Sequence, residues 1–146
     1  NLAKSLDVLW PLFRHRLKDG TSLKINVDES ITILGIEMNL FQVWTNLLKN
    51  AIDALSLDQN YEEKQIVIET EVRGDYVEIH FSNNGPKIPE EISTKIFKKF
   101  FTTKQDQNGT GLGLSLVSKI INEHQGSIRL SSNEDMTTFT VTLPRI

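Results

Sequence analysis

The chain has 146 residues, of which 38% are hydrophobic and 24% are charged, and these proportions are typical of one globular domain with a real core. Sixteen basic residues against 19 acidic residues give a formal net charge of −3, which does not favour binding to nucleic acid or to an anionic membrane surface. The absence of cysteine excludes disulfides, thiolate zinc sites and cysteine nucleophiles, and it is compatible with a cytosolic setting.

The N-terminal segment, residues 2–17, places leucine or phenylalanine at three- and four-residue intervals, and this spacing predicts an amphipathic helix. We expect the helix to end near residues 18–20, where Gly20 can serve as the C-terminal cap, and we expect Pro11 to kink it or delay its start. No apolar run reaches the roughly 18 residues of a membrane span, and no signal-peptide pattern is present. Because the chain begins at Asn1 rather than methionine, we expect a fragment of a longer protein.

Short strands are predicted next at residues 23–27 and 31–34, before a helix that should begin near Glu37, whose carboxylate suits the positive end of the helix dipole. Beyond that helix, residues 66–72 and 76–82 alternate between apolar and polar side chains. The Gly-Asp pair between them is typical of a tight turn, so these two segments predict a β-hairpin.

Residues 41–55, FQVWTNLLKNAIDAL, carry the most informative pattern of the chain. As a helix they form one broad apolar arc, which suits packing on a sheet. On the opposite arc, spacings of four, four and three residues bring Gln42, Asn46, Asn50 and Asp53 together within roughly 80°. Most polar helix stripes are simply solvated, and that interpretation stays open. However, asparagine and aspartate are poor helix formers, and an asparagine carbonyl can ligate a hard cation beside an anion, so a metal–phosphate site is the alternative.

A run of turn formers, NNGPKIP, leads into a helix predicted over residues 89–98. Residues 102–109 lack an apolar period and are expected to form a mobile loop. A helix should follow over residues 111–124, and strands at 127–131 and 138–143 should close the chain. Helices thus fall before, between and after pairs of strands. This order predicts an α+β layered fold whose sheet is antiparallel or mixed rather than doubly wound and parallel.

Two glycine-containing segments are candidates for chemistry. GTGLGL at residues 109–114 opens a helix, where unpaired backbone N–H groups and the positive dipole end attract an anion. A dinucleotide fold would need a strand directly before these glycines and a P-loop would need Gly-Lys-Ser or Gly-Lys-Thr, so both are disfavoured. In the turn at 83–89, Gly85 permits close approach to a flat ligand, and Asn83 or Asn84 could hydrogen-bond a base edge. Taken alone, the two segments could equally be a hinge and a plain connection.

The order of these segments resembles the catalytic, ATP-binding domain of bacterial sensor histidine kinases, in the superfamily that includes type II topoisomerases, heat-shock chaperones and mismatch-repair ATPases. The matching segments are QVWTNLLKNAIDA at 42–54, NNGPKIP at 83–89, IFKKFFTTK at 96–104, GTGLGL at 109–114 and TTFTVTLP at 137–144. The match covers nearly all of the chain. It implies the Bergerat fold, a two-layer sandwich of a mixed, mostly antiparallel sheet of about five strands and three main helices. It also implies a site for ATP and Mg²⁺ between sheet and helices, with residues 102–110 as the lid.

The resemblance also implies roles for individual residues. Asn46 and Asn50 match the asparagines near magnesium and the phosphates, and they are the implied catalytic and metal-binding residues. Asp53 matches a polar position on the same face. Asn83 stands where the family usually has an aspartate that accepts a hydrogen bond from the adenine amino group, and Lys87 replaces a glycine. The implied nucleotide-binding residues are Asn46, Asn50, Asp53, Asn83, Gly85, Ile88, Thr103, Lys104, Gly109, Thr110, Gly111, Leu112, Gly113, Leu114 and Thr137.

Two of these positions bear on the reaction and on its substrate. ATP-hydrolysing relatives carry a glutamate general base four residues before the magnesium asparagine, and here that position is Asn46, which cannot take a proton at neutral pH. The resemblance therefore favours phosphoryl transfer, achieved by positioning and charge neutralisation, over hydrolysis. The neutral Asn83 loses charge assistance worth about 1 kcal/mol, and a rotated amide could donate to a guanine oxygen, so we expect weaker selectivity for adenine.

The resemblance implies that residues 1–146 are the catalytic domain of a protein-histidine kinase. It also implies that residues 1–6 form the end of a preceding dimerisation domain. The γ-phosphoryl group of ATP would pass to a histidine on that separate domain, because His15, His80 and His124 do not match the phosphoacceptor motif. A response regulator is then the partner of the parent protein. We expect the domain to be cytoplasmic, without contact to nucleic acid or membrane, within a parent that can be membrane-anchored.

Three alternatives remain open at the level of the sequence. The first is a nucleotide-binding signalling module without phosphotransfer, a degenerate kinase, which the residues at positions 83 and 87 would support. The second is an ATPase of the same superfamily, against which Asn46 argues. The third is a related kinase that phosphorylates serine on a protein partner, which the segment at residues 97–104 disfavours.

Overall fold

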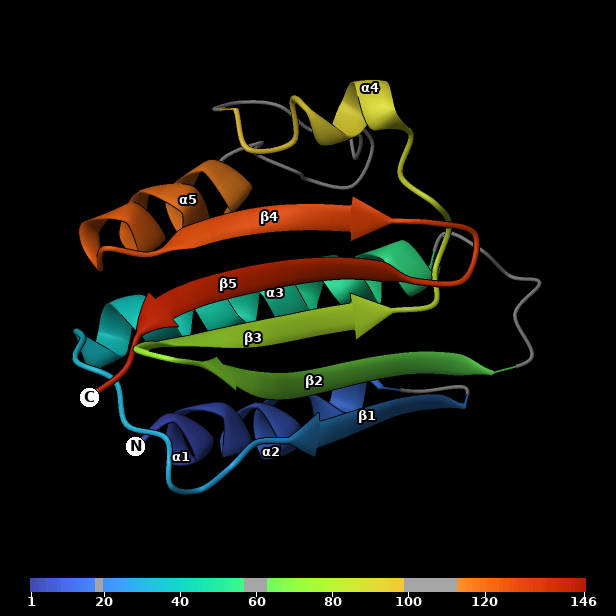
Figure 1. The fold of residues 1–146 in the computed structure, drawn as a ribbon. Helices are drawn as coiled ribbons and strands as arrows, with labels where there is room; N and C mark the ends of the chain where they lie inside the picture. The colour runs from blue at the N-terminus through green and yellow to red at the C-terminus, as the bar shows by residue number, and fades with distance from the viewer. Residues whose placement is uncertain (18–19, 57–62, 99–112) are drawn as a thin grey trace.

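The computed structural model describes residues 1–17, 20–56, 63–98 and 113–146, and its centre is a five-stranded sheet in the order β1-β2-β3-β5-β4 (Figure 1). Strand β1 runs parallel to β2, and the other neighbouring pairs are antiparallel. The predicted mixed, mostly antiparallel sheet is therefore confirmed. The strands are β1 (Thr21–Asn26), β2 (Lys64–Arg73), β3 (Tyr76–Asn83), β4 (Ser127–Ser132) and β5 (Thr137–Pro144).

The main helices lie on one face of the sheet and form the second layer of the fold (Figure 1). The long helix α3 crosses behind the central strands, with α5 on one side of it and α1 on the other. Two layers with a single shared core are what the sequence pattern predicted. The helices are α1 (Leu2–Asp7), α2 (Leu9–Phe13), the 3-10 turn η1 (Arg14–Arg16), α3 (Glu37–Ser56), α4 (Glu90–Ser93) and α5 (Gly113–Glu123).

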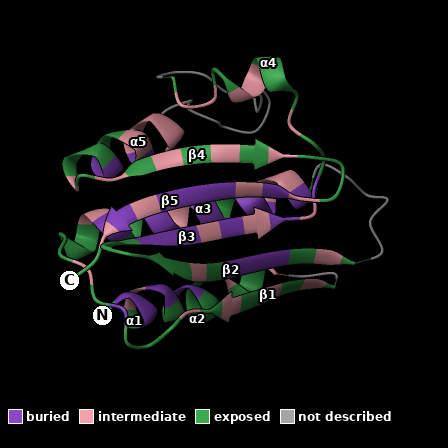
Figure 2. Ribbon diagram, viewed as in Figure 1, coloured by how far each residue is buried: buried purple, intermediate pink, exposed green. Residues whose placement is uncertain are grey.

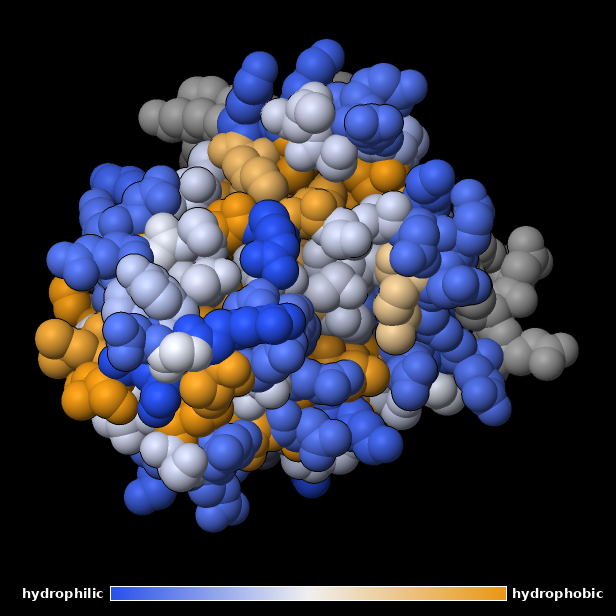
Figure 3. All heavy atoms as spheres, in the orientation of Figure 1, coloured by the Kyte–Doolittle hydropathy of each residue, from blue (hydrophilic) through white to orange (hydrophobic). Residues whose placement is uncertain are grey.

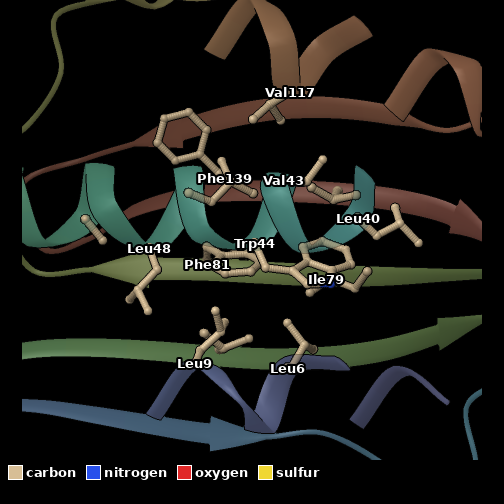
Figure 4. Packing of buried hydrophobic residues seen from close by; sticks show 14 of the residues in the cluster. Leu6, Leu9, Leu40, Val43, Trp44, Leu48, Ile79, Phe81, Val117 and Phe139 are labelled. Carbon is tan, nitrogen blue, oxygen red and sulfur yellow. The ribbon is translucent and has the colours of Figure 1, made fainter. Parts of the chain in front are cut away.

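The core lies between α3 and the sheet, and Trp44 is at its centre (Figure 4). The indole of Trp44 is fully buried and stacks on Phe81 of β3, with ring centroids 5.9 Å apart. Its Nε1 donates a hydrogen bond of 2.8 Å to the hydroxyl of Ser5, so α1 is tied to α3 by a polar contact inside an apolar layer. The apolar arc predicted for residues 41–55 thus faces the sheet, except at Phe41, which is exposed.

The other face of the sheet carries no helix among the described residues (Figures 1 and 2), and many hydrophilic side chains lie on it with apolar ones between them (Figure 3). Glu78 of β3 is buried there beneath two arginines, Arg73 on the neighbouring strand β2 and Arg129 on β4, two strands away. The Arg129 guanidinium, 2.9 Å away, and the Arg73 guanidinium, 3.1 Å away, both donate to the carboxylate. These bonds, with Arg129 first, hold the pKa of Glu78 below its ordinary value against the opposing effect of burial. Ion pairs through Glu78 therefore connect β2, β3 and β4 across this face of the sheet.

The N-terminal helix is broken, and its last turn ends at Arg16, earlier than the predicted end near residues 18–20. Helix α1 ends at Asp7, α2 begins at Leu9, and η1 ends at Arg16. Pro11 explains the break, because it has no N–H to donate to the Asp7 carbonyl four residues earlier and its ring crowds that carbonyl. This interruption agrees with the expectation that Pro11 disturbs the helix.

Two other predicted elements are shorter than expected. Residues 31–34 do not form a strand, because only Ile33 pairs, in an isolated bridge with Arg145, while the Ile31 carbonyl accepts from the N-terminus of α1. The helix predicted over residues 89–98 is helical only at Glu90–Ser93. Hydroxyls of Ser93 and the following threonine bond back to carbonyls three residues earlier, a competition that weakens short helices.

The hairpin and the last elements agree with the sequence. β2 and β3 pair from Ile66↔Asn83 to Arg73↔Tyr76 around a turn in which Gly74 has a φ of +61°, a conformation that glycine adopts without strain. Helix α5 buries Val117, Ile120 and Ile121 and ends at Glu123, as expected. Its predicted start at residue 111 lies outside the described residues.

Candidate functional site

The polar stripe of α3 is not a plain solvated face. Asn46, Asn50 and Asp53 are half-buried, whereas Gln42, one turn earlier on the same stripe, is exposed. The Asn46 side-chain oxygen lies only 3.9 Å from the point where a Cβ on Gly113 would sit, and Gly113 is the first described residue of α5. An uncharged amide therefore faces the N-terminal turn of a second helix, where free N–H groups and the dipole favour an anion.

At the C-terminal part of α3, Asp53 forms an ion pair with Arg16 of η1. The Arg16 Nη2 atom lies 3.1 Å from Asp53 Oδ1, and the two side chains are 36% and 16% exposed. Sequence reasoning missed this arginine, because 37 residues separate the partners and the only local signal was a basic turn, RHR, after a helix.

A second group of predicted residues meets where β3 ends. Asn83 is 2% exposed, and its Oδ1 accepts a hydrogen bond of 2.9 Å from the Gly85 N–H. A Cβ on Gly85 would lie 2.9 Å from that oxygen and 3.5 Å from the carbonyl of Ala54 in α3. Only glycine fits here without displacement, and the turn consequently packs on the helix residue that follows Asp53. The two halves of the predicted site thus adjoin through α3.

Thr137 and Ile88 join this group through a residue that the sequence did not single out, Ser132. Thr137 is paired with Asn83 in the sheet and is buried. Its hydroxyl lies 2.6 Å from that of Ser132, and the Ser132 oxygen accepts a hydrogen bond of 2.9 Å from the Ile88 N–H. Short side-chain contacts therefore connect β4, β5 and the turn after β3, and no buried side-chain polar atom in the described residues lacks a partner.

A pocket of about 590 Å³ opens beside these hydrogen bonds, at the edge of β4. It shares Ile88 and Ser132 with the group just described, so the turn that carries Gly85 also shapes a hollow. Lys87 at its rim is paired with Glu134 at 3.6 Å, although both side chains are well exposed. The pocket is lined by Lys87, Ile88, Pro89, Glu90, Ser93, Leu130 and Ser132.

Several predicted site residues cannot be located. Thr103, Lys104, Gly109, Thr110, Gly111 and Leu112 lie outside the described residues. Of the same motif, Gly113 opens α5 beside Asn46, and Leu114 packs against the hydrophobic core. The lid predicted for residues 102–110 likewise lies outside the described part of the chain.

Two of the three histidines have structural surroundings. His124 accepts from the Ile36 N–H through Nε2 at 3.1 Å, and its Nδ1 lies 2.7 Å from the Ile120 carbonyl, to which it donates. With both ring nitrogens engaged, His124 is poorly placed to act as a nucleophile. His80 Nδ1 lies 3.0 Å from the Thr140 hydroxyl on the outer face of the sheet.

On that outer face, the possible metal ligands Glu71, Glu78 and His80 lie within 4.8 Å of one another. Both carboxylates are already paired with arginines: Glu78 with Arg73 and Arg129, and Glu71 with Arg73 at 3.1 Å. Two guanidinium charges at this position oppose a bound cation, so we do not assign a metal to this cluster.

In the described part of the chain, none of the helices has the length and apolar character needed to span a bilayer.

Comparison with known proteins gives a consistent result. The model of the family described as histidine kinase-, DNA gyrase B- and HSP90-like ATPase matches residues 35–146. Sensor protein VanS of Enterococcus faecium is 38% identical over 129 residues, which are 86% of this chain and 32% of VanS. Heme sensor protein HssS of Staphylococcus aureus is 37% identical over 130 residues, which are 86% of this chain and 27% of HssS. The chain therefore spans about a third or less of these relatives.

Solved structures show the same likeness. The catalytic domain of histidine kinase ThkA, in a nucleotide-free form, superposes with a TM-score of 0.86 at 34% identity, covering 99% of this chain and 95% of that one. ThkA in complex with response regulator protein TrrA matches with a TM-score of 0.80 at 31% identity, covering all of this chain and 41% of that chain.

Proposed function

The chain belongs to the family of histidine kinase-, DNA gyrase B- and HSP90-like ATPases, and from this premise we propose that it is the ATP-binding catalytic domain of a sensor histidine kinase. The observation that carries the proposal is the approach of the Asn46 amide to the first described residue of α5. This proximity places a side chain of the cation-binding type beside an anion-attracting helix end, which is the chemistry that a magnesium-bound polyphosphate requires.

The residues of this face fit a magnesium ion. Asn46 and Asn50 offer uncharged oxygens, half-buried and one helical turn apart, and magnesium prefers oxygen ligands. When bound, the ion would neutralise charge on the phosphates during phosphoryl transfer. Gly113 and Leu114, with Thr103, Lys104, Gly109, Thr110, Gly111 and Leu112 of the lid segment, would line the phosphates.

The base would lie at the other end of the site, where Asn83, Gly85, Ile88 and Thr137 come together. Gly85 supports this assignment, because a residue without a side chain leaves the turn close to α3 and open to a flat ring. Asn83 would contact the exocyclic group of the base, and Thr137 would supply a hydroxyl beside it. Asp53 would flank the phosphate end on the stripe of Asn46 and Asn50.

In the proposed reaction the γ-phosphorus of ATP is attacked by a histidine nitrogen of the parent's dimerisation domain, which yields phosphohistidine and ADP. Asn46 cannot act as a general base, so this chain's residues contribute by orienting the triphosphate and balancing its charge. The likeness to ThkA, solved with a response regulator, supports a response regulator as the downstream partner of the parent.

We further propose that residues 1–146 act as one catalytic unit, with residues 1–6 leading in from the dimerisation domain. Leu2 and Leu6 are fully buried, so residues 1–6 pack against the core of the catalytic domain. VanS and HssS are sensor proteins, which supports a cytoplasmic position for this domain within a parent that can be membrane-anchored.

Calorimetric titration with ATP, with and without Mg²⁺, tests the proposal. Asn50→Ala should weaken Mg-ATP binding tenfold or more, the loss of about 1.4 kcal/mol that one metal-site contact contributes. Gln42→Ala is the matched control, because it truncates an exposed amide on the same stripe. Equal affinities for the two variants would contradict the assignment.

The same protein distinguishes the alternatives. Transfer of labelled phosphate to a supplied cognate dimerisation domain is expected, and its failure despite nucleotide binding would favour a degenerate kinase. Steady phosphate release by the chain alone would favour an ATPase, which the amide at position 46 opposes.

A further inference from the structure

The proposed phosphate face is the side of α3 that carries Asn46, Asn50 and Asp53. Arg16 lies outside residues 35–146, which match the family, and among the described residues of that N-terminal part it is the one cation paired with this face. It reaches α3 from the end of η1, and its guanidinium lies 3.1 Å from Asp53. Asp53 stands three residues after Asn50 and seven after Asn46, so the three side chains follow one face of the helix.

A carboxylate on this face is a problem for the proposed ligand. Three residues along a helix advance about 4.5 Å, so Asp53 stands within a few ångströms of the position proposed for the phosphates. A bare negative charge at that range, in the intermediate dielectric near a protein surface, would weaken binding of a triphosphate on the order of tenfold or more. The charge of Asp53 therefore needs a partner if the face is to hold an anion.

We propose that Arg16 is a positioning residue for nucleoside triphosphates. By holding Asp53 in an ion pair, it cancels the repulsion between this carboxylate and the phosphates, so that the net charge at the phosphate end of the site is neutral or positive. This inference rests on the proposed function. Arginine suits the role because its guanidinium stays charged and can hold one carboxylate oxygen while directing other N–H groups elsewhere.

The exposure of the pair separates this role from a structural one. Ion pairs in which one partner is a third exposed contribute little to folding stability, since water screens them. Loss of Arg16 should therefore leave thermal unfolding of the nucleotide-free protein within a degree or two of wild type. Its effect should appear in ligand affinity and should be larger for ATP than for ADP, which carries less charge.

The test is a double-mutant cycle read by calorimetry with Mg-ATP and Mg-ADP, using Arg16→Ala, Asp53→Asn and the double variant. Arg16→Ala should weaken Mg-ATP binding about tenfold, and Asp53→Asn should tighten it about twofold to fivefold. The double variant should return to within about threefold of wild type, and Arg16→Lys should retain most of the affinity. Arg14→Ala, which removes the same charge from the same turn, is the control and should change affinity less than twofold.

Three results would overturn the inference. If Arg16→Ala and Arg14→Ala weaken Mg-ATP binding equally, only the total charge of the turn matters. If Arg16→Ala weakens Mg-ATP binding as much in the Asp53→Asn background as in wild type, Arg16 acts independently of the carboxylate. If Asp53→Asn weakens Mg-ATP binding as much as Asn50→Ala does, Asp53 is a metal ligand instead. If wild type binds Mg-ATP and Asn50→Ala weakens that binding, these three results reject only the role of Arg16. If wild type does not bind Mg-ATP, both the role of Arg16 and the proposed function are rejected.

Discussion

Replacement of Asn83 by aspartate should raise the protein's selectivity for adenine over guanine. The Gly85 N–H donates to the Asn83 oxygen at 2.9 Å, and this bond fixes the amide so that its oxygen faces the turn. The NH₂ group is then the one on the opposite side. If that side meets the base, as proposed, a donor faces the amino group of adenine, which is also a donor, whereas guanine presents an acceptor at the same position.

The size of the effect follows from the two kinds of hydrogen bond. Aspartate has the same shape, keeps the bond from Gly85 and turns an acceptor with charge toward the base. Hydrogen bonds to charged groups contribute about 1.5–3 kcal/mol and neutral ones about 0.5–1.5 kcal/mol. Part of the gain is lost because the side chain is almost fully buried and its charge must be desolvated. We therefore expect the difference in binding free energy between ATP and GTP to shift by about 1–2 kcal/mol in favour of ATP, which raises the ratio of the two affinities about fivefold to thirtyfold.

Calorimetric titration of both nucleotides into wild type and Asn83→Asp measures this ratio. Asn84→Asp is the matched control: it adds the same charge one residue later, on a side chain that bonds the Gln65 N–H and the Glu63 carbonyl at the start of β2. Thermal unfolding of each variant checks that the fold is intact. An unchanged ATP to GTP ratio in Asn83→Asp would refute the reasoning, as would an equal change in the control.

Three further outcomes can be measured on the same protein. Gly85→Ala would bring a methyl group within 2.9 Å of the Asn83 oxygen, so we expect a stability loss of about 1–3 kcal/mol in urea unfolding and weaker ATP binding, and unaltered values for both would contradict this packing. Trp44→Ala empties the centre of the core and should cost about 3–5 kcal/mol, whereas Trp44→Phe should cost clearly less, mainly through the lost bond to Ser5. The lowered pKa of Glu78 stabilises the fold fully above the ordinary glutamate value of 4.5 and loses this effect as the pH falls through the native-state pKa. The stability difference between wild type and Glu78→Gln should accordingly shrink between pH 6 and pH 3, and a constant difference would exclude the ion pairs as its cause.

Much of the fold could be predicted because its elements are encoded by local periodicity. The apolar arc of α3 and the alternation of β2 and β3 are strong patterns, and the glycine turn between the strands is a local requirement. The predictions failed where tertiary contacts competed with the local pattern. Residues 31–34 read as a strand, yet the Ile31 carbonyl accepts from the N-terminus of α1 instead of from a sheet neighbour.

The candidate site divides in the same way. The stripe of Asn46, Asn50 and Asp53 was visible from helical spacing alone. Ser132 could not have been found, because a serine near the end of a strand is common. Its contact with Thr137 is local to the β4–β5 hairpin, and only the return of β5 beside β3 brings this pair against Ile88.

By itself, the sequence determined which residue types could hold a cation and a polyphosphate, since helical and strand periods follow from backbone geometry within a few residues. Only the tertiary structure decided what those residues meet: Asn46 against the first turn of α5, Gly85 against the C-terminal part of α3, and Arg16 against Asp53. These contacts join segments far apart in the chain, and they form because burial of the shared core fixes how helices and strands pack, which no local pattern specifies.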